Sequence, residues 1–301
     1  MDKTIRDYLR YISLERRYSP HTAESYANDL RQFESFLVEY FGTERIFWQR
    51  IDKKIIRYFL IDLQDKNLSH RSIARKLATL KSFFKYCARE QIIDHNPALS
   101  IRMPRFPKKL PEYLSPDEIT KLLKLPKPSS FEGLRDLAIL ELFYGTGIRL
   151  SELINMKTSD IHFNEKRIHI VGKGNKERIV PIGQHAEQIL KKYLQVRAQY
   201  VNKSVENVFI LQSGNKMYPM AVQRIIKKYL GLVSNLNQKS PHILRHTYAT
   251  HLLNAGASIR TVKDLLGHES LSTTQVYTHL SIDHLKSIYN QAHPGAAKNK
   301  P

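Results

Sequence analysis

The chain has 301 residues, enough for two domains that each bury a core, and it carries 48 Lys and Arg against 28 Asp and Glu, a formal net charge of +20. Such a charge points to an extended polyanion or an anionic membrane face as the partner. The sequence contains no apolar run of bilayer length and no evident secretion signal, so nucleic acid is favoured over a membrane as the partner. Its single cysteine, Cys87, excludes an internal disulfide framework and suits a reducing cytoplasm.

The first predicted elements are helices in the N-terminal half. Ser19 and Pro20 form a helix start, because an N-cap residue is followed by proline in the first helical position. A later helix is predicted to begin near Ser69, and we expect Cys87 in its apolar face. Both helices carry apolar residues at helical spacing: Tyr26, Leu30, Phe33 and Leu37 in the first, and Ile73, Leu77, Leu80 and Phe84 in the second.

The other faces of the second helix are basic. A charged helix face is most often simply solvated. Few acidic residues are spaced to pair with these side chains across one helical turn, so phosphate contact is the preferred interpretation. The residues expected to bind DNA are Arg71, Arg75, Lys76 and Lys81.

The stretch from Ser100 to Pro111 divides the chain. It contains three prolines and four basic residues, and a helix cannot continue through it because proline fixes φ and removes a backbone donor. Lys and Arg are in excess on both sides, which suggests two basic domains that close around a ligand. The predicted domains are 1–99 and 112–293, joined by a linker over 100–111 and followed by a tail over 294–301.

The second half is predicted to combine helices with one small β-hairpin. The sequence of Ser115, Pro116 and Glu118 is a capping box, and the next helix, "LRDLAILELFY", is expected to end at Gly145. The β-prone runs "KRIHIV" and "ERIVPI" flank "GKGNK", which predicts a tight turn with Lys173 at its tip. The remainder, from about residue 185 to 291, is predicted to be mostly helical.

The stretch "SPHILRHTYATHLL" places three cationic or near-cationic side chains close together. On a helix that begins at Ser240, His242, Arg245 and His246 share one face, and the first helical turn favours an anion. Because such side chains repel one another without a negative partner, the stretch predicts an anionic ligand. The apolar residues expected on the opposite face are Leu244, Tyr248 and Leu252.

Each of these residues also has another interpretation. His242 and His246 have the spacing of helical metal ligands, but no carboxylate lies between them and the intervening arginine opposes a cation. Taken singly, His246 is an ordinary core histidine, Arg149 an ordinary surface cation and Lys173 a residue of a hairpin turn. The run "GKGNK" lacks the spacing and the Ser or Thr of a nucleotide-binding P-loop.

The order of the candidate positions decides between these interpretations. They lie in "GTGIRLSEL" with Arg149, "VGKGNKER" with Lys173, "PHILRH" with His242 and Arg245, "LLGHES" with His268, and "TTQVYTHL" with Tyr277. This set resembles the catalytic set of the tyrosine recombinases, and "SPHILRHTYATHLLNAGASIRTVKDLLGHESLSTTQVYTHL" is similar to the bacterial Xer branch. The resemblance covers essentially the whole chain. It implies a mainly α fold of two domains: a helical, SAM-like core-binding domain and a mixed α-helical catalytic domain with a small antiparallel β-hairpin, the DNA breaking-rejoining fold.

The resemblance also implies the residues that handle charge. Arg149 and Arg245 would hold the negative charge that builds on a DNA phosphate under attack, and Glu152 would support Arg149 from the next turn. Tyr277 would be the nucleophile, and its 3′-phosphotyrosine conserves the bond energy, so neither a nucleotide cofactor nor a metal is expected. Without DNA, the crowded cations are expected to be strained.

Three further positions concern protons. The resemblance implies that His242 is the base that accepts the tyrosine proton and that Lys173 is the acid that protonates the departing 5′-hydroxyl. His268 follows Gly267, an expected helix stop, and would donate a hydrogen bond to the phosphate or orient the tyrosine.

The resemblance implies partners as well. Double-stranded DNA is the substrate, and a homo- or hetero-tetramer with a related recombinase would act on two sites and exchange strands through a Holliday junction. A DNA translocase of the FtsK type is an expected activator, without a readable motif here. The expected role is chromosome or plasmid dimer resolution at dif-like sites in the cytoplasm, as part of chromosome partition and cell division. The segment after Tyr277 is expected to dock on a neighbouring subunit rather than in cis.

Other functions stay open. The same chemistry serves integrases and transposases of mobile elements, and type IB topoisomerases use comparable chemistry. A non-catalytic DNA-binding protein is a different class of answer, because "THLLNAGASIRTVKDLLGH" reads as a helix-turn-helix with Gly256 in the turn and Ser258 capping the second helix. A metal-dependent nuclease is disfavoured, since the motifs contain no acidic cluster.

Overall fold

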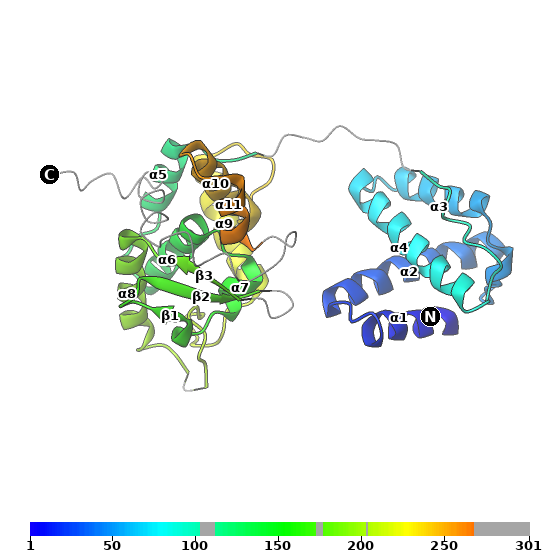
Figure 1. The fold of residues 1–301 in the computed structure, drawn as a ribbon, viewed down its shortest axis with the longest axis horizontal. Helices are drawn as coiled ribbons and strands as arrows, with labels where there is room; N and C mark the ends of the chain where they lie inside the picture. The colour runs from blue at the N-terminus through cyan, green and yellow to red at the C-terminus, as the bar shows by residue number, and fades with distance from the viewer. Residues whose placement is uncertain (103–111, 173–176, 203, 268–301) are drawn as a thin grey trace. The chain divides into compact units, whose positions relative to one another are not determined.

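The structure is a computed structural model, and it describes residues 1–102, 112–172, 177–202 and 204–267. The chain divides into two compact units, Met1–Lys109 and Leu110–Pro301, which are described separately (Figure 1). The described residues are mainly helical with one small antiparallel sheet, which confirms the predicted fold class. None of the helices described is both long enough and apolar enough for a membrane span.

The first unit is a helical bundle. Its elements are α1 (Lys3–Leu14), α2 (Pro20–Phe41), the short 3-10 helix η1 (Trp48–Arg50), α3 (Lys53–Asp65) and α4 (His70–Arg89). The predicted starts of α2 and α4 are confirmed, because the Ser19 and Ser69 side chains accept hydrogen bonds from the backbone N–H groups of Thr22 and Ser72.

Aromatic rings fill the centre of this bundle. Phe33, Phe83 and Phe84 are fully buried, and Trp48 packs against Phe83 with ring centroids 4.8 Å apart. Cys87 is buried in the same core, as predicted, and burial raises the pKa of its thiol. Ile101 also packs into this core at the start of the predicted 100–111 linker, whose residues 103–111 lie outside the described ones.

The second unit begins with three helices, of which the second lies within its core. They are α5 (Pro116–Lys124), α6 (Phe131–Thr146) and α7 (Leu150–Asn155). The predicted capping box is present, because Ser115 accepts from the Glu118 backbone and Glu118 accepts from the Ser115 backbone. Helix α6 is buried all round and packs against α5, α8 and α10. The predicted end of α6 at Gly145 is wrong: the helix continues to Thr146, and Gly147 adopts the left-handed conformation.

A three-stranded antiparallel sheet follows α7 and the 3-10 helix η2 (Thr158–Asp160). Its strands β1 (Ile161–His162), β2 (Arg167–Val171) and β3 (Glu177–Pro181) are paired in that order. The predicted β2–β3 hairpin is confirmed, whereas β1 was not predicted. In the register, Ile168 is paired with Val180, and alternation along β3 turns Arg178 and Val180 to the buried face.

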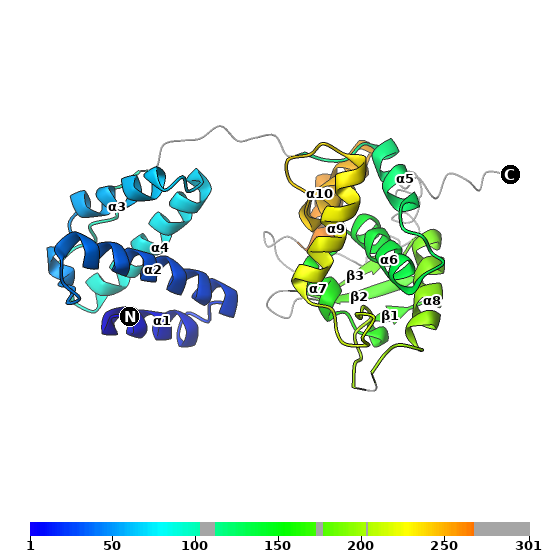
Figure 2. The same cartoon turned by 180° about the vertical axis from the view of Figure 1, so that it is seen from behind.

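Helices complete the second unit. They are α8 (Gln184–Arg197), α9 (Pro219–Val233), α10 (Pro241–Asn254) and α11 (Ile259–Leu266). Helix α9 packs against α5 and α7 and faces the viewer in Figure 2. The turn between α10 and α11 is as predicted, with Gly256 at φ 91°, Ser258 capping α11 and Gly267 ending it in the left-handed conformation. Helix α11 contacts both α10 and β3, which brings its C-terminal end to the edge of the sheet.

Candidate active site

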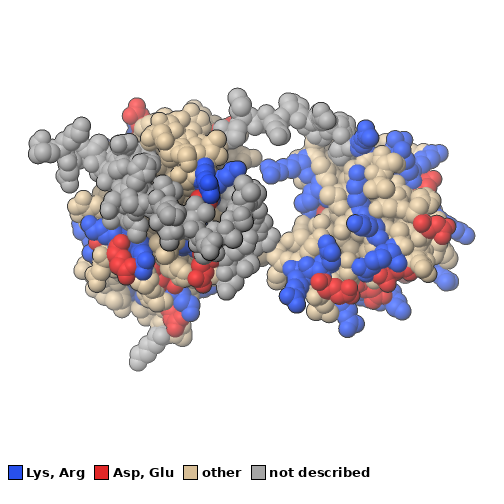
Figure 3. Space-filling model, in the orientation of Figure 1, with Lys and Arg blue, Asp and Glu red and all other residues tan. Residues whose placement is uncertain are grey.

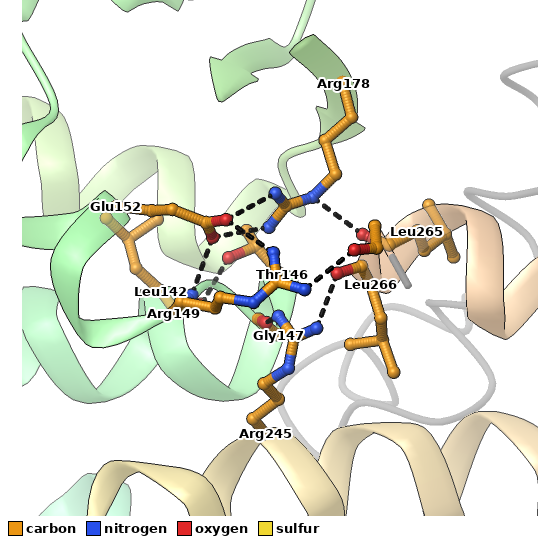
Figure 4. A network of polar contacts seen from close by, with 10 residues as sticks. Leu142, Thr146, Gly147, Arg149, Glu152, Arg178, Arg245, Leu265 and Leu266 are labelled. Atoms are coloured by element: carbon orange, nitrogen blue, oxygen red, sulfur yellow. Dashed lines mark hydrogen bonds and ion pairs between the residues drawn. The ribbon is translucent and has the colours of Figure 1, made fainter. Parts of the chain in front are cut away.

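Three arginines from three different elements converge on one place in the second unit (Figure 4). Arg149 is the N-cap residue of α7, Arg178 lies on β3 and Arg245 lies on α10. Their guanidinium groups point toward one another in Figure 4, with the Glu152 carboxylate beside them on one side and the end of α11 on the other.

Glu152 joins two of these arginines. Its Oε1 accepts hydrogen bonds from Arg178 (2.9 Å) and from the Arg149 guanidinium (2.8 Å), and its Oε2 accepts from Arg178 (2.8 Å) and from the Arg149 backbone N–H (2.8 Å). Burial by itself raises the pKa of this carboxyl, but the Arg178 and Arg149 donors outweigh it and lower the pKa to about 2. Glu152 is therefore ionised at neutral pH.

The C-terminal end of α11 provides the other acceptors. Arg178 Nε donates to the carbonyl oxygen of Leu265 (2.9 Å), Arg245 donates to that of Leu266, and Arg149 donates to that of Gly267 (2.7 Å). The last carbonyl groups of a helix have no partner within the helix and carry the negative end of its dipole. Three consecutive carbonyl oxygens thus each accept from a different arginine. These acceptors hold the three neighbouring cations in the absence of DNA.

Gly147 allows Arg245 to reach this position. Its carbonyl oxygen accepts a hydrogen bond from the Arg245 guanidinium. Its φ of +58° is unfavourable for a residue with a side chain, and an added Cβ would lie 2.6 Å from both Leu266 and the Tyr248 ring. Glycine is therefore required both by the backbone conformation and by the close packing of α6, α10 and α11.

Among the residues that the structure describes, the cluster has more positive than negative charge. Burial, together with the neighbouring Arg149 and Arg178, lowers the pKa of Arg245 to about 10, so Arg245 is still protonated at neutral pH. Glu152 compensates only part of the charge of three guanidinium groups. Arg149 keeps 32% of its side chain exposed, whereas Arg178 keeps 5%. The surplus charge favours an anion, and Arg149 is the most accessible donor toward it.

The sequence-based site is partly within the described residues. Arg149 and Arg245 come together, and the expected contact from Glu152 to Arg149 is present. Lys173, His268 and Tyr277 lie outside the described residues.

His242, Arg245 and His246 lie on the predicted helix, where their spacing places them on one side, but they differ in burial. Arg245 is buried, whereas His242 is exposed and His246 is half-buried against the Tyr113 ring. Arg245 is turned inward because it donates to carbonyl groups of α6 and α11. Ser240 precedes α10 as predicted, although its side chain makes no capping hydrogen bond.

Sequence reasoning missed Arg178. The signal was present in the run "ERIVP", where strand alternation places Arg178 on the same face as Val180. An arginine at an inward-facing strand position needs buried acceptors, and Glu152 and Leu265 supply them.

The expected DNA-binding residues of α4 divide into two kinds. Arg71 is exposed and Lys81 is half-buried. The prediction considered only acidic residues one helical turn away, whereas Arg75 and Lys76 both donate to Asp29 on a different helix, α2. Lys76 is buried by this ion pair, so it does not lie on the basic surface. Figure 3 shows other Lys and Arg side chains spread over much of the visible face of the first unit.

Metal binding is not supported by the part of the chain that the structure describes. Within it, no group of three or more His, Cys, Asp or Glu side chains is placed to hold an ion. The one carboxylate of the arginine cluster is already occupied by guanidinium donors.

Comparisons with known proteins agree with this geometry. Residues 112–284 match the phage integrase family, and residues 5–91 match the phage integrase N-terminal SAM-like domain. A tyrosine recombinase XerC from Syntrophus aciditrophicus (strain SB) is 43% identical, over 98% of this chain and 99% of its own length. A tyrosine recombinase XerD from Staphylococcus haemolyticus (strain JCSC1435) is 38% identical, over 98% of this chain and all of its own.

A solved structure shares the fold. The XerH site-specific recombinase, crystallised with a palindromic difH substrate as a post-cleavage complex, has a TM-score of 0.72 and 21% identity, covering 94% of this chain and 80% of that one. At this identity the similarity concerns the fold alone.

Proposed function

This chain belongs to the phage integrase family of tyrosine recombinases, and on that premise we propose how it cuts and rejoins DNA at a specific site. The observation that carries the proposal is the convergence of Arg149 and Arg245 in a cluster with surplus positive charge. A phosphodiester under attack gains negative charge on its non-bridging oxygens, and planar guanidinium donors stabilise that charge.

Tyr277 is the proposed nucleophile. Its phenolic oxygen attacks the scissile phosphorus, a 3′-phosphotyrosine bond forms, and the bond to the 5′-oxygen breaks. A 5′-hydroxyl from the other duplex then attacks the phosphotyrosine and releases the tyrosine. The number of phosphoester bonds is conserved in each step, so the reaction needs no ATP, and the arginines are proposed to provide the charge stabilisation that a metal ion would otherwise give.

The proton transfers are assigned to three residues. His242 lies exposed in the first turn of α10, one helical turn before Arg245, and is the proposed base for the Tyr277 proton. Lys173, between β2 and β3, is the proposed acid for the departing 5′-hydroxyl. His268, directly after the left-handed Gly267, is proposed to donate to the phosphate or to orient Tyr277.

The proposed biological role is resolution of chromosome or plasmid dimers at dif-like sites in the cytoplasm. It is supported by relatives named XerC and XerD and by a fold relative named as bound to difH DNA. We propose a homo- or hetero-tetramer with a related recombinase on two sites, a Holliday junction intermediate, and activation by a DNA translocase. Arg71 and Lys81 are proposed phosphate contacts. An integrase or transposase of a mobile element is the alternative role with the same chemistry.

A trapping experiment tests the chemistry. The protein is incubated in EDTA with a dif-like duplex that carries a nick beside the cleavage position, so that the released fragment diffuses away. We expect a covalent protein–DNA adduct with the wild-type chain and none with Tyr277→Phe. An adduct that survives Tyr277→Phe would refute the nucleophile. Tight DNA binding without any wild-type adduct would favour the non-catalytic helix-turn-helix alternative.

A further inference from the structure

We propose that Arg178 is a positioning residue of the recombination reaction, which holds Arg149 in its working orientation through Glu152. This role rests on the proposed function of Arg149 as a phosphate ligand. Arg178 is 5% exposed and donates to Glu152, which also accepts from Arg149, so it acts on Arg149 through the carboxylate rather than on DNA.

The hydrogen bonds of Glu152 are fully used. A carboxylate offers about four lone-pair positions. Arg178 occupies one on each oxygen with its two terminal nitrogens, and Arg149 occupies the other two with its guanidinium and its backbone N–H. The plane of the carboxylate is therefore set by the rigid fork of Arg178, and the Arg149 guanidinium takes its direction from that plane.

Arg178 also ties β3 to α11. Its Nε donates to Leu265, while its other two nitrogens donate to Glu152 on α7. One side chain thus connects three elements around Arg149, whose own Nη2 donates to Gly267 two residues beyond Leu265. A lysine has one flexible ammonium in place of the planar fork and cannot make these three bonds in the same geometry.

The protonation state of Glu152 depends on Arg178. The charged groups that face Glu152 are Arg149 on α7, Arg178 on β3 and, farther away, Arg245 on α10. Lys157, Asp160 and His169 line a cavity on its other side. Removing Arg178 leaves a buried carboxyl with Arg149 as its remaining hydrogen-bonded cation, and burial then raises its pKa. Protonated Glu152 loses an acceptor position, and Arg149 loses its support.

The test compares Arg178→Gln and Arg178→Lys with wild type and with Arg167→Gln. Arg167 is the matched control, because it lies on the paired strand β2 and bonds to Glu165 at the surface. The nicked dif-like duplex is the probe, and adduct formation at saturating DNA is measured beside equilibrium binding of the intact duplex.

We expect Arg178→Gln to slow adduct formation about 100-fold, because a small misplacement of a phosphate donor has an effect of this size. Binding should change by less than about threefold, since many phosphate contacts share the affinity. Arg178→Lys should lie between Arg178→Gln and wild type.

The pH dependence of adduct formation distinguishes a positioning role of Arg178 from a role in the stability of the protein alone. Arg178→Gln should lose adduct formation at a higher pH than wild type as the pH falls, because Glu152 takes up a proton more readily without the Arg178 donors. The double variant Glu152→Gln with Arg178→Gln should lack this loss of activity at low pH, because it has no carboxyl group at position 152. It also removes both buried charges, so it can be measured if Arg178→Gln alone fails to fold.

The outcomes distinguish the two proposals. A folded Arg178→Gln protein with wild-type adduct formation, an unchanged pH profile, or a proportional loss of binding would overturn the role of Arg178 and leave the proposed function intact. A wild-type chain without a Tyr277-dependent adduct would overturn the proposed function and the role of Arg178 with it.

Discussion

Asp29 in the first unit and Glu152 in the second are both buried carboxylates that accept hydrogen bonds from two basic side chains. Asp29 accepts from Arg75, Lys76 and Thr79, all on α4, and so joins α2 to α4. Glu152 accepts from residues on α7 and β3, with Arg245 of α10 beside it.

The two clusters differ in the positive charge that remains after the carboxylate has been paired. Two cations share Asp29, and one of them, Arg75, has an exposed side chain. Two guanidiniums bond to Glu152 and a third, that of Arg245, lies beside it; all three also donate to carbonyl oxygens. A buried ion pair therefore does not by itself indicate a ligand, whereas a surplus of positive charge gathered from several elements favours an anion.

The largest expected effect is from removing one of the arginines that give the Glu152 cluster its surplus positive charge. Arg245→Ala should slow adduct formation about 1000-fold, because one of the two proposed donors to the developing phosphate charge is lost. DNA binding should change only a few-fold, since many phosphate contacts share the affinity. Single-turnover adduct formation and equilibrium binding measure the two effects, with Arg167→Ala as the control. If binding fell in proportion to cleavage, Arg245 would be a docking residue instead.

Removing Asp29, the carboxylate of the cluster in the first unit, should lower the stability of the protein rather than the rate of cleavage. Asp29→Ala leaves the buried Lys76 ammonium without its carboxylate and should lower the free energy of unfolding by about 4 kcal/mol. Urea unfolding followed by the fluorescence of Trp48, the one tryptophan of the chain, measures this unit. Asp62→Ala is the control, since it breaks only the exposed pair with Lys66 and should cost about 0.5 kcal/mol. Equal effects of the two variants would show that the Asp29 cluster is dispensable.

Low pH should weaken the arginine cluster of the second unit, because Glu152 becomes protonated. The folded-state pKa of about 2 lies below the ordinary value of 4.5, so the stabilisation is complete above about pH 4.5 and is lost as the pH falls toward 2. The shift corresponds to about 3 kcal/mol. The measurement is the difference in unfolding free energy between wild type and Glu152→Gln across this range, with Glu165→Gln at the surface as the control. A difference that stays constant with pH would contradict the assignment.

The smallest effect concerns two helix-ending glycines with similar φ angles, Gly42 at +65° and Gly147 at +58°. Gly42 has open space where a Cβ would lie, whereas Gly147 faces Leu266 and Tyr248 at 2.6 Å. Gly42→Ala should cost about 1 kcal/mol from backbone conformation alone, and Gly147→Ala about twice that. Urea unfolding followed by circular dichroism compares them. Equal costs would mean that the packing around Gly147 relaxes freely.

Local signals explain what the sequence could predict. The caps at Ser19, Ser69 and Ser115 and the hairpin of β2 and β3 depend on residues a few positions apart, and all are present. The division into two domains came from the proline-rich stretch 100–111, whereas the meeting of Arg149 with Arg245 came from the resemblance.

Long-range contacts account for what the sequence could not predict. The partners of Asp29 lie 46 to 50 positions away, and those of Arg178 lie 26 and 87 positions away. Helix α6 ends at Thr146 rather than Gly145, and the Gly147 that follows packs against Tyr248 and Leu266, which lie far along the chain. No periodicity within one helix or strand contains such information.

The three carbonyl groups at the end of α11 have one more consequence. Because Leu265, Leu266 and Gly267 are consecutive and each accepts from a different arginine, a rotation or slide of α11 would change all three contacts together. The three guanidiniums are thereby coupled to the start of the segment that leads to Tyr277. Their energetic contributions should be cooperative, so a double-mutant cycle between Arg178 and Arg245 should show non-additive effects although no hydrogen bond between the two is needed.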